Sequence, residues 1–454
     1  MSFFRNVLHW SPLVAVFFLV SCGGGDSVPA TSTVVLARGT YTSGADSWQY
    51  ELLQLPNADG GYSYAQWFPA SSAALAPVIV RTEPYAGIDW TGEAVDQRWA
   101  AQGNGCFPDV DGPNFQSGVS STICYEKFTP DRVGMDSEIY LRNGFGVLTT
   151  FGRFYAGGSV WNDVQDMTAG LKFLGTLSNV DATRIGMFGT SWGGFEAVYG
   201  SAYASAGVVP KASVAIAPVI DFEALVNYVD TTIPLVTNAT TLPRYNAFFD
   251  PYLRRLFATT GGRPGSAGAV YSRVTAASIG TRLNTQLLVM HDDSDTILPV
   301  ATSKSFVAAN PAHAQGFWYK QSDTIDYNAN ILTHGPFGSA TVYAPIYTFS
   351  ISYLFTALGN SGQLLVVPYG NADLDGFFQD IRTYQMGGRN IGWLVPRLRE
   401  FCDSRVYVYD LTPGTSIPSM SGAQLLAAKI NAGWGTSFNA VTVCNQLVGS
   451  GLPP

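Results

Sequence analysis

The run Arg184-Ile-Gly-Met-Phe-Gly-Thr-Ser-Trp-Gly-Gly194 constrains the fold more than any other stretch of this chain. Apolar residues 185–188 predict a short buried strand, and a helical pattern follows the turn. The G-x-S-x-G spacing around Ser191 is that of a nucleophile elbow, in which flanking glycines let strand and helix approach without side-chain collision. Such a turn strains the backbone at Ser191 and exposes its hydroxyl at a helix N-terminus, which favours negative charge. The alternative is an ordinary strand–helix turn that happens to contain a serine. A histidine and an acid later in the chain decide between the two interpretations.

A histidine must take the proton of a serine hydroxyl before that hydroxyl becomes a useful nucleophile at neutral pH. The chain has four histidines: His9, His291, His313 and His334. His9 lies in a predicted export signal, and His313 precedes its predicted strand, so it should lie at the opposite edge of the sheet. His334 follows the last predicted core strand, where catalytic groups gather in open α/β sheets, and Gly335 leaves room around its ring. We therefore predict His334 as the general base and His291 as a brace of the loop that carries the acid.

A buried carboxylate is needed to hold the imidazole in the right tautomer. Three aspartates follow the predicted strand 286–290: Asp292, Asp293 and Asp295. Asp295 lies deepest in the turn, so we predict it as the acid, with Asp292 and Asp293 as alternatives. Loop aspartates usually cap the next helix or face solvent, which is the role otherwise expected of those two. The order Ser191, Asp295, His334 is the order that this kind of elbow uses.

Two hydrogen-bond donors must meet the oxygen of a tetrahedral intermediate. The backbone N–H of Trp192, next after the nucleophile, is the first predicted donor. The second should come from the loop after the predicted strand 77–80, either from the Tyr85 hydroxyl or from a backbone N–H. The other role open to Tyr85 is that of a packed loop aromatic.

Short apolar runs alternate with helical patterns along most of the chain, which predicts an α/β fold with a mostly parallel sheet covered by helices on both faces. The predicted strands are 50–55 and 62–68 (a hairpin), 77–80, 145–151, 185–188, 212–216, 286–290 and 316–320. The predicted helices are 136–143, 162–177, 301–309 and 343–358.

This pattern defines a predicted domain at 46–359. Residues 218–285 interrupt it with an aromatic-rich, proline-punctuated stretch that we predict to be an inserted cap, with 248–257 helical. Residues 360–454 form a C-terminal appendage whose role the sequence does not indicate. We expect strands at 364–367 and 405–409 and a helix at 422–432 within it.

The first residues predict export. Arg5 precedes an apolar stretch, 13–20, that is too short to span a bilayer, and Leu19-Val20-Ser21-Cys22 resembles a bacterial lipobox. We predict a lipoprotein signal at 1–21, lipidation of Cys22, and a flexible tether at 22–45 rich in Gly, Ser and Thr. The expected location is the bacterial cell envelope, with the membrane as a partner through the lipid. The alternative is an ordinary secretory signal cleaved nearby.

Four further cysteines remain: Cys106, Cys124, Cys402 and Cys444. An even number in an oxidising compartment predicts two disulfides, and local pairing, Cys106 with Cys124 and Cys402 with Cys444, is our choice among three connectivities. The competing interpretation, zinc binding, lacks Cys-x-x-Cys spacing and a nearby histidine, so no metal is predicted. A formal net charge of −8 without any basic cluster argues against nucleic acid as a partner.

Several motifs together resemble one family: the run 184–194, His291-x-x-x-Asp295-x-x-x-Pro299, His334-Gly335, Arg81-Thr-Glu-Pro-Tyr85, and Gly144-Phe-Gly-Val-Leu148 with Arg153 and Gly157-Gly158. Across residues 75–340 the chain resembles the α/β-hydrolase superfamily, within it the Xaa-Pro dipeptidyl-peptidase and cocaine-esterase-like branch, and more loosely prolyl-oligopeptidase catalytic domains. The resemblance implies that Tyr85 donates to the oxyanion. The chain departs from that branch at Glu83, which interrupts the Arg-Thr-Pro-Tyr signature, at Asp292, which replaces a glycine, and in lacking a strand-rich C-terminal region.

The sequence therefore predicts an exported serine hydrolase that cleaves ester or amide bonds of small molecules or short peptides through an acyl-enzyme on Ser191, without a metal or cofactor. A first alternative is an Xaa-Pro-type or other aminopeptidase, which would need Glu83, Asp89 or Glu223 to bind a substrate amino group. An alternative of another class is a catalytically silent, surface-binding lipoprotein that keeps the fold as a scaffold. The oligomeric state is left open.

Overall fold

The computed structural model describes the following residues: 32–43, 46–71, 75–88, 107–108, 122–123, 126–155, 158–320, 334, 340–359, 364–366, 402, 406–408 and 420–449. Within them, no helix combines the length and the apolar character that crossing a bilayer requires.

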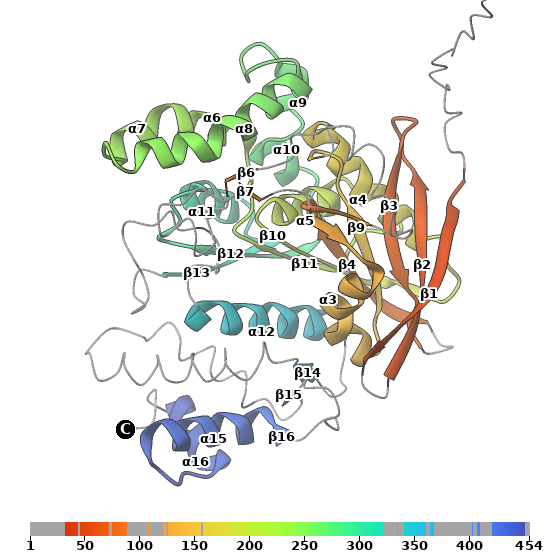
Figure 1. The fold of residues 1–454 in the computed structure, drawn as a ribbon, viewed down its shortest axis with the longest axis vertical. Coiled ribbons are helices and arrows are strands. Elements are labelled where there is room, and N and C mark those ends of the chain that lie inside the picture. Colours follow the sequence, from red (N-terminus) through yellow and green to blue (C-terminus); the bar gives the residue numbers. More distant parts are fainter. Residues whose placement is uncertain are drawn as a thin grey trace, which may run out of the picture.

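A nine-stranded sheet runs through the main body of the protein (Figure 1). In spatial order its strands are β1 (Val34–Ser43), β2 (Asp46–Pro56), β3 (Tyr62–Phe68), β9 (Gly146–Phe151), β4 (Ala76–Glu83), β10 (Val180–Thr190), β11 (Ala212–Ile216), β12 (Gln286–Asp292) and β13 (Ala314–Tyr319). The first three strands and the β3–β9 pair are antiparallel, and every pair from β9 onward is parallel. The exchanged positions of β9 and β4, followed by strands in chain order, are those of the α/β-hydrolase fold. The predicted fold class is confirmed.

Helices cover both faces of this sheet, as the side chains of β12 make clear. Leu287 and Val289 belong to the same apolar cluster as Phe306 of α11 (Val300–Ala309), whereas Leu288 and Met290 belong to the cluster of Leu354 on α12 (Ala340–Ala357). Successive side chains of a strand point to opposite faces, so both faces are buried and the strand reads as a continuous apolar run. The α11 face also carries α4 (Val160–Leu174) and α5 (Trp192–Ala202), and the α12 face carries α3 (Pro130–Arg142).

The segment between β11 and β12, which includes the predicted cap, is helical. Its elements are α6 (Phe222–Asn227), the π-helical turn η1 (Tyr228–Thr232), α7 (Ile233–Val236), α8 (Leu242–Thr260), α9 (Gly268–Tyr271) and α10 (Ala276–Gly280). Helix α8 extends the predicted helix in both directions. A proline in its first turn and Gly261, with φ of 87°, set its ends. The bounds of the cap as a unit, 218–285, stay a prediction.

The chain leaves β11 at Ala217, a fully buried residue with φ of 46°. An L-residue with a side chain seldom adopts this left-handed conformation, and the cost is about 1–3 kcal/mol. The Ala217 N–H donates to the carbonyl oxygen of Met290 on β12 at 2.7 Å. This bond ties the strained joint to the neighbouring strand.

The predicted tether, 22–45, is wrong in its second half, because residues 34–43 form β1. This strand pairs with β2 along its length, and Tyr41 is buried with its ring stacked on Trp48 at a centroid distance of 5.8 Å. Its small and polar residues resemble a linker in composition, but they lie on an edge strand, where one face needs few large apolar side chains.

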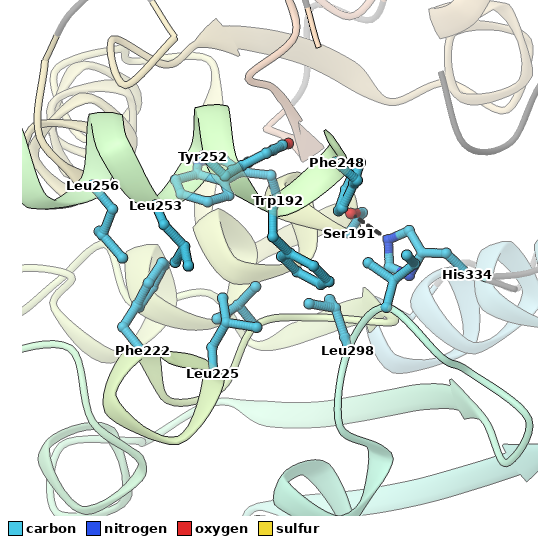
Figure 2. A pocket seen from close by; sticks show the side chains of 13 residues that line it. Ser191, Trp192, Phe222, Leu225, Phe248, Tyr252, Leu253, Leu256, Leu298 and His334 are labelled. Atoms are coloured by element: carbon cyan, nitrogen blue, oxygen red, sulfur yellow. Dashed lines mark hydrogen bonds between the residues drawn. The ribbon is translucent and has the colours of Figure 1, made fainter. Parts of the chain in front are cut away.

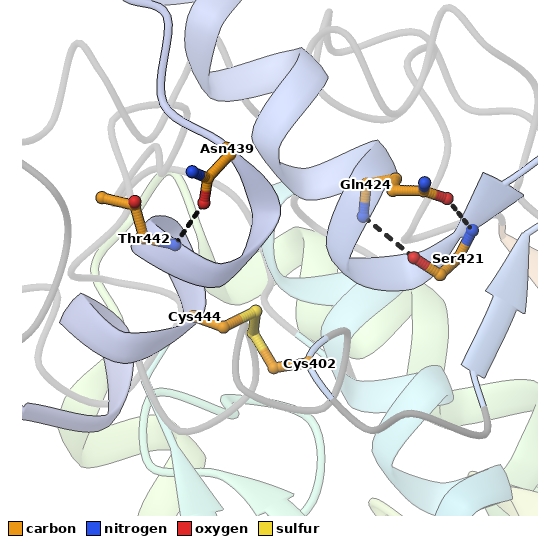
Figure 3. Close-up of a disulfide and its surroundings, with 6 residues drawn as sticks. All are labelled: Cys402, Ser421, Gln424, Asn439, Thr442 and Cys444. Atoms are coloured by element: carbon orange, nitrogen blue, oxygen red, sulfur yellow. Dashed lines mark hydrogen bonds between the residues drawn. A yellow bond between two sulfur atoms is a disulfide. The ribbon is translucent and has the colours of Figure 1, made fainter.

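Beyond α12 the described residues include a small sheet, β14 (Leu364–Val366), β15 (Val406–Val408) and β16 (Met420–Ser421), and two helices, α15 (Gly422–Trp434) and α16 (Ala440–Gly449). Ser421 and Gln424 form a capping box at the start of α15. A disulfide joins Cys402 to Cys444 with a Cα–Cα distance of 5.7 Å (Figure 3), as predicted.

The other predicted disulfide, Cys106 with Cys124, lies outside the described residues. Next to these positions, β6 (Phe107–Pro108) pairs with β7 (Thr122–Ile123) in antiparallel orientation. A second short pair, β5 (Ala86–Ile88) with β8 (Glu126–Phe128), is parallel.

Candidate active site

The turn between β10 and α5 holds Ser191 in a strained conformation, with φ of 56° and ψ of −117°. The Ser191 N–H donates to the carbonyl oxygen of Ile216 at 2.7 Å, and the Thr82 hydroxyl donates to the carbonyl oxygen of Gly193 at 2.8 Å. A Cβ atom at Gly193 would stand 2.7 Å from that hydroxyl oxygen, so the close approach of α5 to β4 requires glycine there. The turn therefore has the strain and the tight packing that the G-x-S-x-G spacing predicts.

Three side chains that are far apart in the sequence meet at the carboxyl edge of the sheet. Ser191 Oγ lies 2.6 Å from Nε2 of His334, and Nδ1 of His334 lies 2.9 Å from Oδ2 of Asp295. Asp295 follows β12, so strand order brings it beside the Ser191 turn. The distances are those of a hydrogen-bonded proton relay.

The Asp295 carboxylate accepts hydrogen bonds from two backbone N–H groups and from two histidine rings. The backbone N–H groups of Ile297 and Leu298 each donate to Oδ1 at 2.8 Å. Oδ2 lies 2.9 Å from His334 Nδ1 and 3.1 Å from His291 Nε2. Burial alone would raise the pKa of this carboxyl, but the His334 ring and the hydrogen bonds from both histidines hold its pKa well below its usual range.

This carboxylate fixes the tautomers of both rings. An ionised carboxylate only accepts, so Nδ1 of His334 and Nε2 of His291 must both carry protons. Nε2 of neutral His334 is then free to accept the Ser191 proton. His291 is fully buried, and its other nitrogen, Nδ1, accepts from the Ser303 hydroxyl at 2.9 Å. His291 thus braces the acid loop, as its place in the sequence suggested.

The alternative acids and the remaining histidine have other partners. Asp292 accepts from the backbone N–H and the hydroxyl of Ser294, and Asp293 forms an ion pair with Lys304 at 2.6 Å on the surface. These are the local loop contacts expected of aspartates that are not catalytic. His313 precedes β13 and is not among the residues that line the pocket beside Ser191.

The two predicted oxyanion donors face each other beside Ser191. The backbone N–H of Trp192 donates to the Tyr85 hydroxyl at 2.9 Å, and that hydroxyl is also within hydrogen-bonding reach of Ser191. Burial raises the pKa of Tyr85 well above its ordinary value, so the phenol stays protonated and can donate. A substrate oxygen placed between them would accept from both groups in exchange for the bond they now share.

The Trp192 side chain is held in place by Asp163, a residue that the sequence did not indicate as part of the site. Its indole N–H donates to Oδ2 of Asp163 at 2.7 Å, and its ring stacks on Phe154 at a centroid distance of 4.2 Å. Oδ1 of Asp163 accepts from the backbone N–H groups of Arg153 and Phe154, each at 2.6 Å. The only available signal is that Asp163 stands four residues before Met167, at helical spacing from the buried side of the predicted helix 162–177.

An apolar pocket opens beside Ser191 and His334 (Figure 2). Side chains of α8 point toward Trp192 and toward residues of α6 across the pocket. Its other lining residues are Val219, Phe222, Leu225, Phe248, Phe249, Tyr252, Leu253, Leu256, Ile297 and Leu298. None of the described lining residues is an aspartate, glutamate, lysine or arginine. The pocket offers about 30 Å³ to water-sized groups, and one water molecule needs roughly 10–15 Å³, so a small apolar group fits it as it stands.

Of the three acids considered for binding a substrate amino group, Glu83 and Glu223 do not line this pocket. Glu83 is half-buried, and its Oε1 accepts from the backbone N–H of Tyr85 at 3.3 Å. Glu223 is exposed on α6, and Asp89 lies outside the described residues. Among the described residues, no group of three or more His, Cys, Asp or Glu side chains could hold a metal ion.

Comparison with known proteins gives a likeness in shape only. No protein-family model and no curated protein matches the chain. Among solved structures, Porphyromonas gingivalis dipeptidyl peptidase 4 is similar with a TM-score of 0.41 and 17% identity, over 70% of this chain and 36% of that one. Acetyl xylan esterase from Paenibacillus sp. R4 gives 0.39 and 13%, over 64% and 82%. The Pyrococcus horikoshii acylaminoacyl peptidase gives 0.39 and 13%, over 61% and 38%.

The match thus spans about a third of the length of the two peptidases. These TM-scores and identities are too low to carry an argument. The fold assignment rests on this chain's own strand order and on the strained serine after β10.

The contacts of His291 generate the first prediction. His291→Leu removes one donor to the Asp295 carboxylate, and losing a hydrogen bond to a charged group should lower kcat/KM for an ester by about 10- to 100-fold. His291→Gln, whose amide can still donate to Asp295, should recover part of the loss. The measurement is steady-state kinetics of both variants, with unfolding curves to check the fold. Equal turnover by His291→Leu and wild type would show that the brace is dispensable.

Proposed function

We propose that this chain is a serine hydrolase that cleaves a carboxylic ester through an acyl-enzyme on Ser191. The observation that carries the proposal is the hydrogen-bonded series from Ser191 Oγ through His334 to Asp295. Beside it stand a backbone N–H and a protonated phenol, the two donors that an oxyanion needs.

In the proposed reaction, His334 Nε2 takes the proton of Ser191 as its oxygen attacks the carbonyl carbon. The carbonyl oxygen becomes negative and accepts from the Trp192 N–H and the Tyr85 hydroxyl. Protonated His334 then gives its proton to the leaving alcohol, and the acyl group stays on Ser191. A water molecule, deprotonated by His334, then attacks the acyl carbon; the bond from that carbon to Ser191 Oγ breaks, His334 returns the proton to Ser191, and the acid is released. Asp295 remains ionised throughout and stabilises the imidazolium.

The pocket supports a small, uncharged acyl group as the substrate part that lies beside Ser191. Aromatic and aliphatic side chains line it, and burying an apolar chain among them is favourable by roughly 0.8 kcal/mol per CH₂. An aminopeptidase would need an acid for the substrate amino group, and the described lining residues supply none. The silent-scaffold alternative leaves unexplained why a serine, a histidine and an aspartate are all held in hydrogen-bonding geometry.

The second prediction tests the activity. A fluorophosphonate probe should label the wild-type protein at Ser191, and labelling should vanish in Ser191→Ala because the nucleophile is gone. Tyr85→Phe should still be labelled but should lose about 10²-fold in kcat for p-nitrophenyl acetate, the usual cost of one oxyanion donor. In-gel fluorescence and spectrophotometric rates are the measurements. A folded wild-type protein that resists labelling would favour the scaffold, and faster turnover of Xaa-Pro amides than of esters would favour the peptidase.

The third prediction concerns the acyl chain. Leu253 lines the pocket from α8, so Leu253→Ala should enlarge it and shift the preferred p-nitrophenyl ester from acetate or butyrate toward longer chains. Leu235→Ala is the matched control, since Leu235 lies in the same helical segment but is 85% exposed. It should leave the chain-length profile unchanged. An unaltered profile in Leu253→Ala would mean that this pocket does not hold the acyl group.

We further propose that the enzyme is exported and anchored to the bacterial envelope through a lipid on Cys22, a residue outside the described part of the chain. The fourth prediction is that full-length protein fractionates with membranes and incorporates labelled palmitate, whereas Cys22→Ser does neither. Retention of Cys22→Ser in the membrane fraction would contradict the lipid anchor. The test leaves the activity proposal untouched.

A further inference from the structure

A second group of acids lies directly behind the proposed oxyanion donor. Glu196 stands on α5, one helical turn after Trp192, and is fully buried. Among the described residues, neither of its carboxyl oxygens has a hydrogen-bond donor. A buried carboxylate without a donor is among the costliest arrangements in a protein, so the ionisation state of Glu196 requires a physical explanation.

The guanidinium of Arg153 forms ion pairs with two other acids, Asp166 and Asp59. Arg153 Nε lies 2.7 and 3.0 Å from the two oxygens of the fully buried Asp166. Its Nη1 donates to Asp59 at 3.0 Å. Arg153 is thus matched by these two carboxylates, and in the part of the chain that the structure describes no salt bridge joins a cation to Glu196 or to the equally buried Asp163.

Asp163 and Glu196 differ sharply in the donors they receive. Asp163 accepts two backbone N–H groups and the indole N–H of Trp192, as an ionised carboxylate should. A Cβ atom at Gly152 would overlap with Oε1 of Glu196 and would stand 3.1 Å from Oδ1 of Asp163, so the two carboxyl groups lie against the same glycine. The two carboxyl groups therefore adjoin, and one proton between them satisfies both.

We propose that Glu196 keeps its proton at neutral pH and donates it to Asp163, and that this acid pair is a positioning device for Trp192. Asp163, with its fourth hydrogen bond filled by Glu196, holds the indole N–H. The fixed indole in turn holds the Trp192 backbone N–H toward the substrate oxygen. Glu196 and Asp163 do not touch the substrate, and the effect on turnover rests on the proposed hydrolase function.

The charges around the pair give its pH dependence. Burial raises the pKa of Glu196 well above its ordinary value, and the negative charges of Asp163, Asp166 and Glu83 add to the rise. Burial also raises the pKa of Asp163 to about 6, although its three hydrogen-bond donors and the charge of Arg153 act to lower it. A group whose pKa is raised by folding stabilises the protein below its ordinary pKa, and this stabilisation is lost as pH rises through the raised value. Alkaline pH should therefore place two carboxylates side by side beneath Trp192.

The fifth prediction uses Glu196→Gln, which cannot ionise and whose amide can donate to Asp163 at any pH. Infrared spectra of wild-type protein near neutral pH should contain the carbonyl band of a protonated carboxylic acid, and Glu196→Gln should lack it. Wild-type kcat/KM should fall by about tenfold on the alkaline side, the usual effect of disrupting one hydrogen bond to a charged group. In Glu196→Gln that fall should be absent, with near-wild-type turnover at neutral pH. Glu223→Gln, the same change at an exposed glutamate of α6, should behave as wild type in both measurements.

Each outcome decides one part of the proposal. A wild-type spectrum without the band, or a band that survives in Glu196→Gln, overturns the shared proton. Identical alkaline profiles for wild type and Glu196→Gln overturn the positioning role. If Glu196→Gln does not fold, loss of the wild-type band on alkaline titration decides the first question. The band needs no substrate, so its presence in a protein that turns over no ester would contradict the hydrolase proposal alone.

Discussion

The buried Asp295 carboxylate is the group on which the geometry of the site depends. A charge in this position is tolerable only when its lone pairs are filled, and two backbone N–H groups and two histidines fill them. Each donor is thereby fixed in turn: the loop after β12 closes on the carboxylate, His291 is held against Ser303, and Nε2 of His334 is turned toward Ser191. The Asp295 carboxylate is thus removed from water and fully hydrogen-bonded by the same set of groups.

Much of this arrangement could be read from the residues, because the parallel sheet leaves few choices. Strands buried on both faces are nearly continuous apolar runs, and polar residues that follow parallel strands gather at one edge of the sheet. This placement is what predicts Asp295 and His334 as the acid and the base. The strain at Ser191 follows from glycine spacing alone. Chain order then assigns the acid and the base, since only a few histidines and loop aspartates compete.

Other features depend on contacts that sequence patterns do not encode. The sequence of β1 resembles a tether because an edge strand needs little apolar surface. Nothing in the sequence links Asp163 to Glu196, and their importance arises only when α4 and α5 bring them together beside Trp192. The sequence also does not predict that α8 lines the pocket, because helical periodicity predicts which face of a helix is buried but not what that face covers.

The strained backbone at Ala217 has a consequence for how the pocket can open. This residue joins β11 to the helices that carry the pocket wall, and glycine would occupy its conformation with less strain. Alanine restricts rotation at the joint, whereas hinges are positions that absorb large changes in φ and ψ. Its bond to Met290 adds a further restraint. Substrate entry should therefore depend on local shifts of α8 and its side chains. The backbone at Ala217, where the helical segment leaves the sheet, should stay in place while the pocket opens.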